Sequence, residues 1–303
     1  MTIADASHDA MLTSVPVQPV ELTRHRGFLV QSLGLKRTRF GLVIVGLVVA
    51  VAIFGPLFAP HSPTAFVGAP FSGPSATARF GADYLGRDVL SRFLNGGRNI
   101  LLIGVLGTLL GVGCGTALGL FAGYSMRAAD DIVMRVVDLL LAFPGIVLAL
   151  LVITVIGPHG WVLVCVVGLT YMPYTARIVR SSTIQVRETD FVKYAQGTGT
   201  PTRRILTSEI LPNIAAPLTV EFGLRLTHSI GLIAGLDYLG LGVGPPTADW
   251  GLMTQENQNG LTTAPLSVLL PIMAIVLLTI GANLVTDGIG HAAAGAERTV
   301  AST

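Results

Sequence analysis

Long apolar stretches separated by shorter polar segments dominate the chain from residue 40 onward. Six of them reach the length, about 20 residues, that a helix needs to cross the hydrocarbon core of a membrane. They are Phe40–Ala59, Ile100–Tyr124, Ile132–Ile156, Trp161–Ile178, Ala215–Leu236 and Leu266–Val285. The pattern therefore predicts an all-α, polytopic membrane protein with six transmembrane helices.

Glycines and prolines add detail to three of these stretches. In the second stretch a glycine recurs every four residues, which places these glycines on one helical ridge and predicts close packing against another helix. They are Gly107, Gly111, Gly115, Gly119 and Gly123. Pro144 and Pro173 each remove a backbone donor from a predicted span, so kinks are expected there.

The composition agrees with a membrane-embedded chain. Hydrophobic residues make up 51% of the 303 residues and charged residues 12%, a balance too apolar for a soluble globular protein of this length. The net charge of +2 indicates no basic surface, so no nucleic-acid partner is expected. The two cysteines and six histidines lack the spacing of a metal site or a disulfide scaffold. No cofactor and no metal are predicted.

Positive charges before the first stretch set the predicted orientation. Residues 24–39 carry lysine and arginine but no acidic residue, the flank expected on the cytoplasmic side. Alternate connections and both termini are then cytoplasmic. The predicted units are a cytoplasmic tail (1–39), a first helix (40–59), an extracytoplasmic connection (60–99), a five-helix core (100–287) containing a cytoplasmic loop (181–213), and a C-terminal cytoplasmic tail (288–303).

The cytoplasmic loop is too long for a tight turn and too polar to lie in lipid. A helix-compatible segment starting at Asp190 ends at the Gly197–Gly199 breaker pair. Thr200 as N-cap and Pro201 as first helical residue then predict a second helix, which stops before Pro212 and presents an apolar face. That face consists of Ile205, Leu206, Ile210 and Leu211. Two such helices fit a groove on another protein; the alternative is a solvated connector.

Residues 194–213, YAQGTGTPTRRILTSEILPN, resemble the EAA loop of the permease subunits of ATP-binding-cassette (ABC) importers. Ala195, Gly199 and Leu211-Pro212-Asn213 match that pattern, whereas Tyr194 replaces an alanine, Lys193 an acidic residue and Glu209 an isoleucine. The resemblance implies that this loop contacts an ATPase. The residues that it assigns to this contact are Asp190, Tyr194, Ala195, Gly199, Arg203, Arg204, Glu209, Leu211 and Pro212.

Further stretches are similar to the dipeptide, oligopeptide and nickel branch of these permeases. They are residues 81–92 (GADYLGRDVLSR), 138–144 (DLLLAFP), 238–251, which begin YLGLG, and 283–288. The resemblance implies a type I ABC importer permease fold in the plasma (inner) membrane. The implied partners are a paralogous permease, two cytoplasmic ATPase subunits and an extracytoplasmic binding protein. Because the chain has no GxxxxGK[ST] phosphate loop, ATP must be bound by the partners, and the chain itself is not expected to be an enzyme.

The fifth stretch departs from that branch. Family members often have a glutamate where this chain has Ile233, and here Glu221, Arg225 and His228 share one helix face instead. An arginine at the centre of a span costs roughly 2.5 to 3.5 kcal/mol, so Glu221 is expected to pair with Arg225 one turn away. Either this face lines the translocation pathway and recognises charged ends of the cargo, or the ion pair only fixes helix packing.

Two single residues carry smaller expectations. Asp138 lies one turn from Arg135 near the cytoplasmic end of the third stretch, which predicts a local ion pair. Trp250 lies in the outside segment 237–265, which has no lysine or arginine, and is a candidate interfacial anchor.

Two other classes of protein compete with an ABC permease. A stand-alone, ion-coupled secondary transporter could use the intramembrane Glu221, Arg225, His228 and Asp138, and co-purification of an ATPase separates the two. An intramembrane enzyme would need a converging nucleophile and base, and neither Asp138 nor Asp287 has such a context. The sequence does not choose between dipeptides, longer peptides, nickel complexes and other conjugates as cargo.

Overall fold

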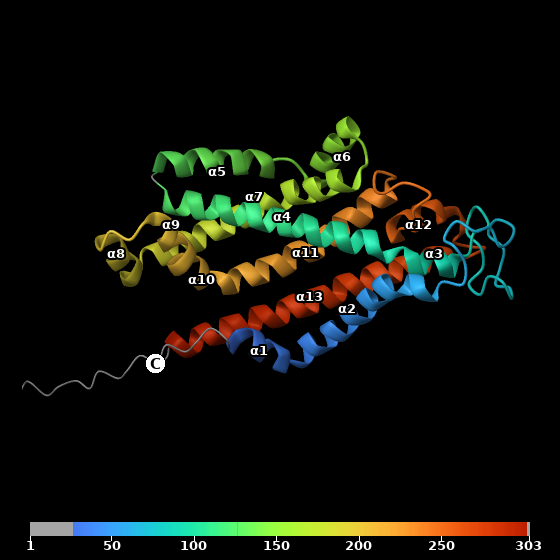
Figure 1. Ribbon diagram of the computed structural model, residues 1–303, viewed down its shortest axis with the longest axis horizontal. Helices are drawn as coiled ribbons and strands as arrows, with labels where there is room; N and C mark the ends of the chain where they lie inside the picture. Colours follow the sequence, from blue (N-terminus) through green and yellow to red (C-terminus); the bar gives the residue numbers. More distant parts are fainter. Residues whose placement is uncertain (1–26, 126, 302–303) are drawn as a thin grey trace, which may run out of the picture.

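The structure is a computed structural model that describes residues 27–125 and 127–301, and in these ranges the fold is all-α (Figure 1). The helices of the first half are α1 (Gly27–Gly34), α2 (Lys36–Phe54), the 3-10 helix η2 (Gly55–Phe58), α3 (Val89–Asn95), α4 (Gly97–Tyr124), α5 (Arg127–Leu141), α6 (Gly145–Ile156) and α7 (Gly160–Arg187). Those of the second half are α8 (Asp190–Gly197), α9 (Thr202–Arg204), the π-helix η3 (Ile205–Ile210), α10 (Leu211–Asn213), α11 (Ala215–Tyr238), α12 (Trp250–Glu256), the 3-10 helix η4 (Gln258–Gly260) and α13 (Leu266–Ala301).

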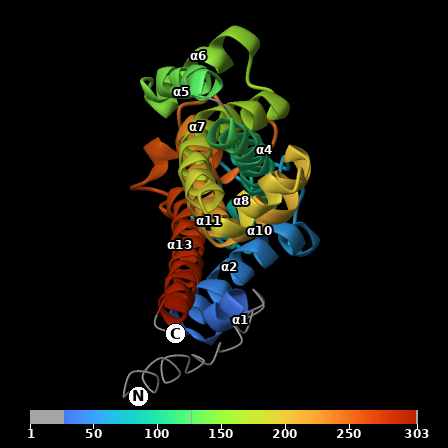
Figure 2. The ribbon, with the colours of Figure 1, turned by 90° about the vertical axis from the view of Figure 1, so that its left-hand side faces the viewer.

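The long helices α2, α4, α7, α11 and α13 run along the molecule between two ends (Figure 1). Helices α8 to α10 form one end, which we call the hairpin end, and α3, α12 and the 60–88 segment form the other. Viewed from the hairpin end, α5 and α6 lie on one side of the α4–α7 pair, and α2 with α13 on the other (Figure 2).

Four helical segments in the described ranges are long and apolar enough to cross a membrane: Lys36–Phe58, Val89–Tyr124, Gly160–Arg187 and Leu266–Ala294. They correspond to the first, second, fourth and sixth predicted spans. The predicted third span is broken before Pro144 into α5 and α6, which are bent by 85° and count as a fifth span if they cross together. The predicted kink at Pro144 is thus a full break, whereas Pro173 lies inside the continuous α7.

The predicted fifth span forms α11, which is long enough at 24 residues but is not among the apolar candidates. Its charged side chains Glu221, Arg225 and Asp237 lower its hydropathy, and two of them, Glu221 and Asp237, are buried inside the protein. Length and composition therefore support four or five spans, and α11 depends on its neighbours to bury its polar groups.

The glycine ridge of α4 packs directly against α7, as predicted. A Cβ atom at Gly115 would lie 2.6 Å from the carbonyl oxygen of Met172, and one at Gly119 would lie 2.6 Å from that of Ala176. Such distances leave no room for a side chain, so the two backbones approach as closely as small residues allow. This contact holds α4 and α7 together as one pair.

Buried side chains from α2, α4, α6, α7, α11, α12 and α13 form the main core. Trp250 is 0% exposed, stacks on Phe93 with ring centroids 5.7 Å apart, and donates from its indole nitrogen to the Phe93 carbonyl. The prediction of an interfacial anchor at Trp250 is wrong, because the segment that carries it folds back onto α3 and α4.

Candidate functional site

The segment 190–213 forms a helical hairpin whose turn requires a glycine. Helix α8 ends at Gly197, and Gly199 has a φ of +75°, the left-handed conformation that side chains disfavour. The second arm starts one residue later than predicted, since Pro201 is the N-cap and Thr202 the first helical residue. It also continues through Pro212 to Asn213, because the preceding turns are a π-helix and the proline falls in the first turn of α10.

The hairpin has a small hydrophobic core of its own. Val192 from α8 packs with Ile205 and Ile210 from η3, and these side chains meet Val179 of α7 and Ile214 before α11. Two residues of the predicted apolar face, Ile205 and Ile210, are buried, and Leu206 and Leu211 pack against them half-buried. The hairpin is therefore fixed to the ends of α7 and α11.

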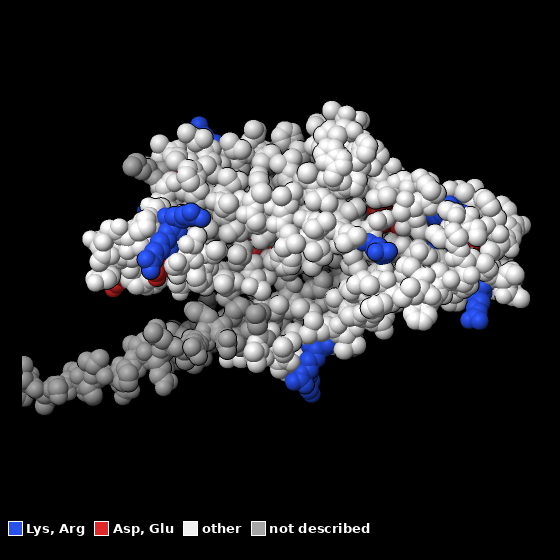
Figure 3. All heavy atoms as spheres, in the orientation of Figure 1, with Lys and Arg blue, Asp and Glu red and all other residues white. Residues whose placement is uncertain are grey.

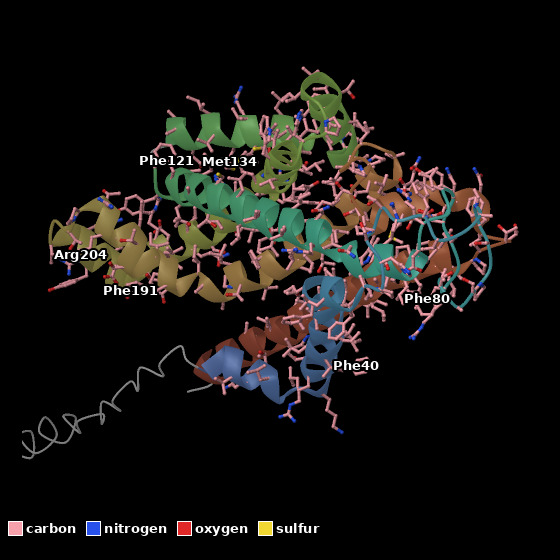
Figure 4. All side chains as sticks on the ribbon, turned by 45° about the vertical axis from the view of Figure 1, so that its right-hand side comes forward. Phe40, Phe80, Phe121, Met134, Phe191 and Arg204 are labelled. Carbon is pink, nitrogen blue, oxygen red and sulfur yellow. The ribbon has the colours of Figure 1, made fainter. Side chains whose placement is uncertain are left out.

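The outer surface of the hairpin carries large exposed side chains. Tyr194 is 74% exposed and Phe191 43%. Phe191 and Arg204 both lie at the hairpin end, opposite the end that carries Phe80 (Figure 4). Of the other residues assigned to ATPase contact, Asp190, Gly199, Arg203, Arg204 and Pro212 are exposed, whereas Ala195, Glu209 and Leu211 are half-buried. One basic patch with acidic side chains at its edge lies at this end, other basic side chains lie at the opposite end, and the central part of the same face shows few charges (Figure 3).

The middle of α11 carries the predicted ion pair. The Arg225 Nε donates to Glu221 Oε1 at 2.7 Å, so the prediction of pairing one helical turn apart is confirmed. Thr175 of α7 donates its hydroxyl to the same Glu221 oxygen at 3.1 Å. Glu221 is only 2% exposed, so its charge is satisfied entirely by protein groups.

Two tyrosines of α7 complete this cluster, and the sequence analysis missed them. The Arg225 guanidinium lies 4.9 Å from the centre of the Tyr174 ring and 5.9 Å from that of Tyr171. Tyr171 donates its hydroxyl to the His228 carbonyl at 2.9 Å, and its ring lies 6.3 Å from the His228 ring. The signal was present, because Tyr171, Tyr174 and Thr175 follow the i, i+3, i+4 spacing of one helix face.

The three predicted residues of this face do not contact one another equally. His228 makes no hydrogen bond to Glu221 or Arg225 among the described residues; its Nδ1 bonds the Leu224 carbonyl oxygen at 2.7 Å. His228 and Tyr174 are exposed, Arg225 is half-buried and Glu221 is buried. The cluster is thus layered, with the carboxylate at the back and the rings at the surface.

A second charged cluster lies at the end opposite the hairpin, and we call it the charge clamp. Arg87 donates to Asp83 at 2.7 Å and to Glu256 at 3.1 Å, and Arg92 donates to the same Glu256 oxygen at 2.6 Å. All four side chains are at most 5% exposed. The clamp ties the segment before α4 to α12.

Tyr84 and Asn257 reinforce the charge clamp. Tyr84 donates its hydroxyl to Glu256 at 3.1 Å, and its backbone amide donates to the Asn257 side chain at 2.9 Å. Burial, followed by the negative charge of Glu256, raises the pKa of the Tyr84 phenol, so Tyr84 stays a neutral donor. The sequence placed these charges in one connection but gave no signal for Glu256 as their partner.

The ion pair predicted between Asp138 and Arg135 is wrong. Asp138 on α5 instead binds Arg177 of α7 at 2.6 Å, and Asp130, two turns earlier, binds Arg180 through both carboxylate oxygens. Because α5 packs beside α7, cross-helix partners compete successfully with the local one. The Asp138–Arg177 pair is about 60% exposed on both sides.

Comparisons with known proteins place the chain. Residues 115–293 match the family described as "Binding-protein-dependent transport system inner membrane component", and residues 36–74 match "N-terminal TM domain of oligopeptide transport permease C".

Curated relatives cover most of the chain. A dipeptide transport system permease protein of Alkalihalophilus pseudofirmus is 35% identical over 83% of both chains. A glutathione transport system permease protein of Pectobacterium atrosepticum is 35% identical over 93% of this chain and 95% of its own. A di/tripeptide transport system permease protein of Pseudomonas aeruginosa is 35% identical over 83% of this chain and 86% of its own. The chain therefore belongs to the inner-membrane components of binding-protein-dependent transport systems, as a multi-pass ABC importer permease of the dipeptide and oligopeptide branch.

Proposed function

We propose that this chain is one permease subunit of an ATP-driven importer of short peptides, and that it forms the translocation pathway together with a paralogous permease. The observation that carries the proposal is its similarity over most of its length to permeases named for dipeptide, glutathione and di/tripeptide transport. The other proposed partners are two cytoplasmic ATPase subunits, which bind the ATP, and an extracytoplasmic protein that delivers the cargo.

The 190–213 hairpin is the proposed contact with the ATPase. Its exposed Phe191 and Tyr194 offer apolar surface for a partner, and its buried core attaches it to α7 and α11. If the ATPase subunits bind the hairpin, their motion would therefore move both helices. In this orientation the hairpin and both termini face the cytoplasm, and the charge clamp faces the outside.

The Glu221, Arg225 and His228 face is the proposed wall of the pathway. Two observations support this role. His228 and Tyr174 reach the surface midway along α11 and α7, and the Glu221 carboxylate, buried behind them, is paired with Arg225 and Thr175. Because α11 starts beside the hairpin core and carries this wall at its middle, hairpin motion would reach the wall through one helix.

Site-directed cross-linking tests the hairpin contact. In a background with Cys114 and Cys165, which are both free, replaced by alanine, Tyr194→Cys should cross-link to the ATPase subunit in whole membranes. Phe66→Cys, at the opposite end and 73% exposed, is the matched control and should not. Efficient cross-linking of the ATPase at residue 66 but not at 194 would refute the proposed coupling.

A second test uses the turn glycine. Gly199 has open space around its Cα but a positive φ, so Gly199→Val strains the turn without a clash. We expect loss of cargo-stimulated ATP hydrolysis in the assembled complex. Full stimulation in this variant would remove the hairpin turn from the mechanism.

A further inference from the structure

Charge at the proposed pathway wall is arranged asymmetrically. Both Glu221 oxygens point to protein donors: Oε1 accepts from Thr175 and from Arg225 Nε, and Oε2 lies 3.5 Å from Arg225 Nη2. With 2% of its surface exposed, Glu221 has no route to a passing molecule. A cargo can reach only what lies in front of this carboxylate.

Two hydrogen-bond donors lie in front of it without a protein partner. Arg225 Nη1 makes no hydrogen bond or ion pair within the described residues, and it is not among the buried unpaired atoms, so it keeps some exposure on a side chain that is 13% exposed overall. The hydroxyl of Tyr174, on an exposed side chain, likewise has no partner in the described ranges. An arginine and a phenol that both offer N–H or O–H groups suit an anionic acceptor.

The guanidinium is held in place before any cargo arrives. Glu221 fixes it through Nε, and the Tyr174 and Tyr171 rings lie against it at 4.9 and 5.9 Å. Tyr171 is itself anchored by its hydroxyl on the His228 carbonyl. A preorganised donor loses little freedom on binding, and an arginine beside aromatic rings keeps its charge in a low-dielectric wall.

We infer that Arg225 and Tyr174 form a carboxylate-recognition step in the pathway, which contacts a carboxylate of the passing peptide while Glu221 acts only to position Arg225. This inference rests on the proposed function. Two carboxylates of a peptide have this chemistry, the one at its C-terminus and the one on an acidic side chain. The contact is also expected to be transient, because Glu221 already balances the charge of Arg225 and accepts hydrogen bonds from its Nε and Nη2.

The test measures uptake by the complete complex in proteoliposomes. ATP is enclosed in the vesicles, on the side that carries the hairpin, and the binding protein is added outside. A dipeptide with a free C-terminus and its C-terminal amide are compared in wild type, Arg225→Gln, Tyr174→Phe and Arg225→Lys. The same binding protein delivers both compounds to every variant, so its own preference cancels when acid-to-amide ratios are compared. Tyr238→Phe, on the same helix but outside the cluster, is the matched control.

We expect Arg225→Gln to lower the acid-to-amide ratio about tenfold, the loss of one charge-assisted hydrogen bond. Tyr174→Phe, which keeps the ring over the guanidinium, should lower it about threefold, the loss of a neutral one. Arg225→Lys should keep part of the wild-type acid-to-amide ratio. The control Tyr238→Phe should keep the full wild-type ratio. An amidated dipeptide with an acidic side chain shows which of the two carboxylates is recognised. If wild type takes it up better than the Arg225→Gln variant by the same factor as the free acid, the side-chain carboxylate also uses this step.

The outcomes separate this inference from the proposed function. If the wild-type complex takes up neither compound in an ATP-dependent way, the proposed function fails. If wild type transports both, and Arg225→Gln and Tyr174→Phe keep its acid-to-amide ratio, the carboxylate step is overturned. Should Arg225→Gln not assemble, Tyr174→Phe alone decides, because it leaves the ion pair with Glu221 intact.

Discussion

The two ends of this permease treat charge in opposite ways. At the charge clamp, Arg87, Arg92 and Glu256 are buried and each has several partners within the chain. At the hairpin end, the Lys193–Glu188 pair is more than half exposed on both sides, and Arg203 and Arg204 have no ion pair among the described residues.

This contrast separates an end whose charges are paired within the chain from an end whose charges are exposed and available to a partner. Buried ion pairs within one chain fix its structure, since removing one partner leaves the other without compensation. Exposed charges contribute little to stability but remain free to bind another protein. The clamp end is therefore held together by contacts within the chain. At the hairpin end, only the inner side is packed in this way, and the outer side is open to a partner.

The largest expected effect comes from breaking the clamp. Glu256→Ala removes the acceptor shared by Arg87 and Arg92, so the free energy of unfolding should fall by about 3–5 kcal/mol. Thermal unfolding of the purified protein measures it. Glu188→Ala, at the exposed pair near the hairpin, is the control and should change stability by less than about 0.5 kcal/mol. Equal effects at the two sites would abolish the contrast between the ends.

A methyl group added to a glycine at each end should have opposite effects on stability. A Cβ at Gly97 would lie 2.5 Å from the Ala52 Cβ and 2.6 Å from the Trp250 ring, whereas one at Gly197 meets no atom within 4 Å. Gly97→Ala should lower the free energy of unfolding by about 1–3 kcal/mol through overpacking. Gly197→Ala should raise it slightly, because the unfolded chain loses freedom. The reverse order in a denaturation experiment would contradict the packing described here.

The stability of the two ends should also depend differently on pH. Burial raises the pKa of the Asp249 carboxyl, which caps α12. The folded protein therefore holds this proton more tightly than the unfolded chain, so stability is greatest below about pH 4 for this group and falls as the pH rises toward the raised pKa. Each unit of the increase is equivalent to about 1.4 kcal/mol.

Asp249→Asn checks this pH dependence, because its side-chain oxygen can still cap the helix but cannot ionise. The fall in unfolding temperature between pH 4 and 7 should become smaller in this variant. Asp190→Asn, at the exposed start of the hairpin, should leave the slope of the wild type unchanged. An unchanged slope in Asp249→Asn would show that Asp249 is not the group responsible.

The smallest change in stability is expected where we propose the partner binds. Arg203→Glu combined with Arg204→Glu replaces exposed charges, so the unfolding temperature of the isolated subunit should barely move. Cargo-stimulated ATP hydrolysis of the assembled complex should fall strongly. Normal stimulation in the double variant would mean that these arginines take no part in coupling.

Local patterns in the sequence predicted local structure well. The four-residue glycine spacing predicted close packing of α4 against another helix, which the structure identifies as α7. The spacing of Glu221 and Arg225 predicted their ion pair, because both predictions depend only on helical geometry. The hairpin itself was predicted from its breaker glycines and from a family resemblance, and the structure changed only its boundaries.

Contacts between distant segments could not be predicted in the same way. Arg92 and Glu256 lie 164 residues apart, and no periodicity connects them. Asp138 pairs with Arg177 and not with the neighbouring Arg135, because the packing of α5 against α7 decides which arginine is near. Trp250 looked like an anchor by composition, yet the fold of its segment buries it.

Uphill uptake with and without the ATPase subunits decides whether this chain is part of an ATP-driven importer. This permease and its paralogue, reconstituted in vesicles with the binding protein, should accumulate peptide against a gradient only when the ATPase subunits and ATP are present. Accumulation by the two permeases alone, driven by an ion gradient, would contradict the account and favour a secondary transporter.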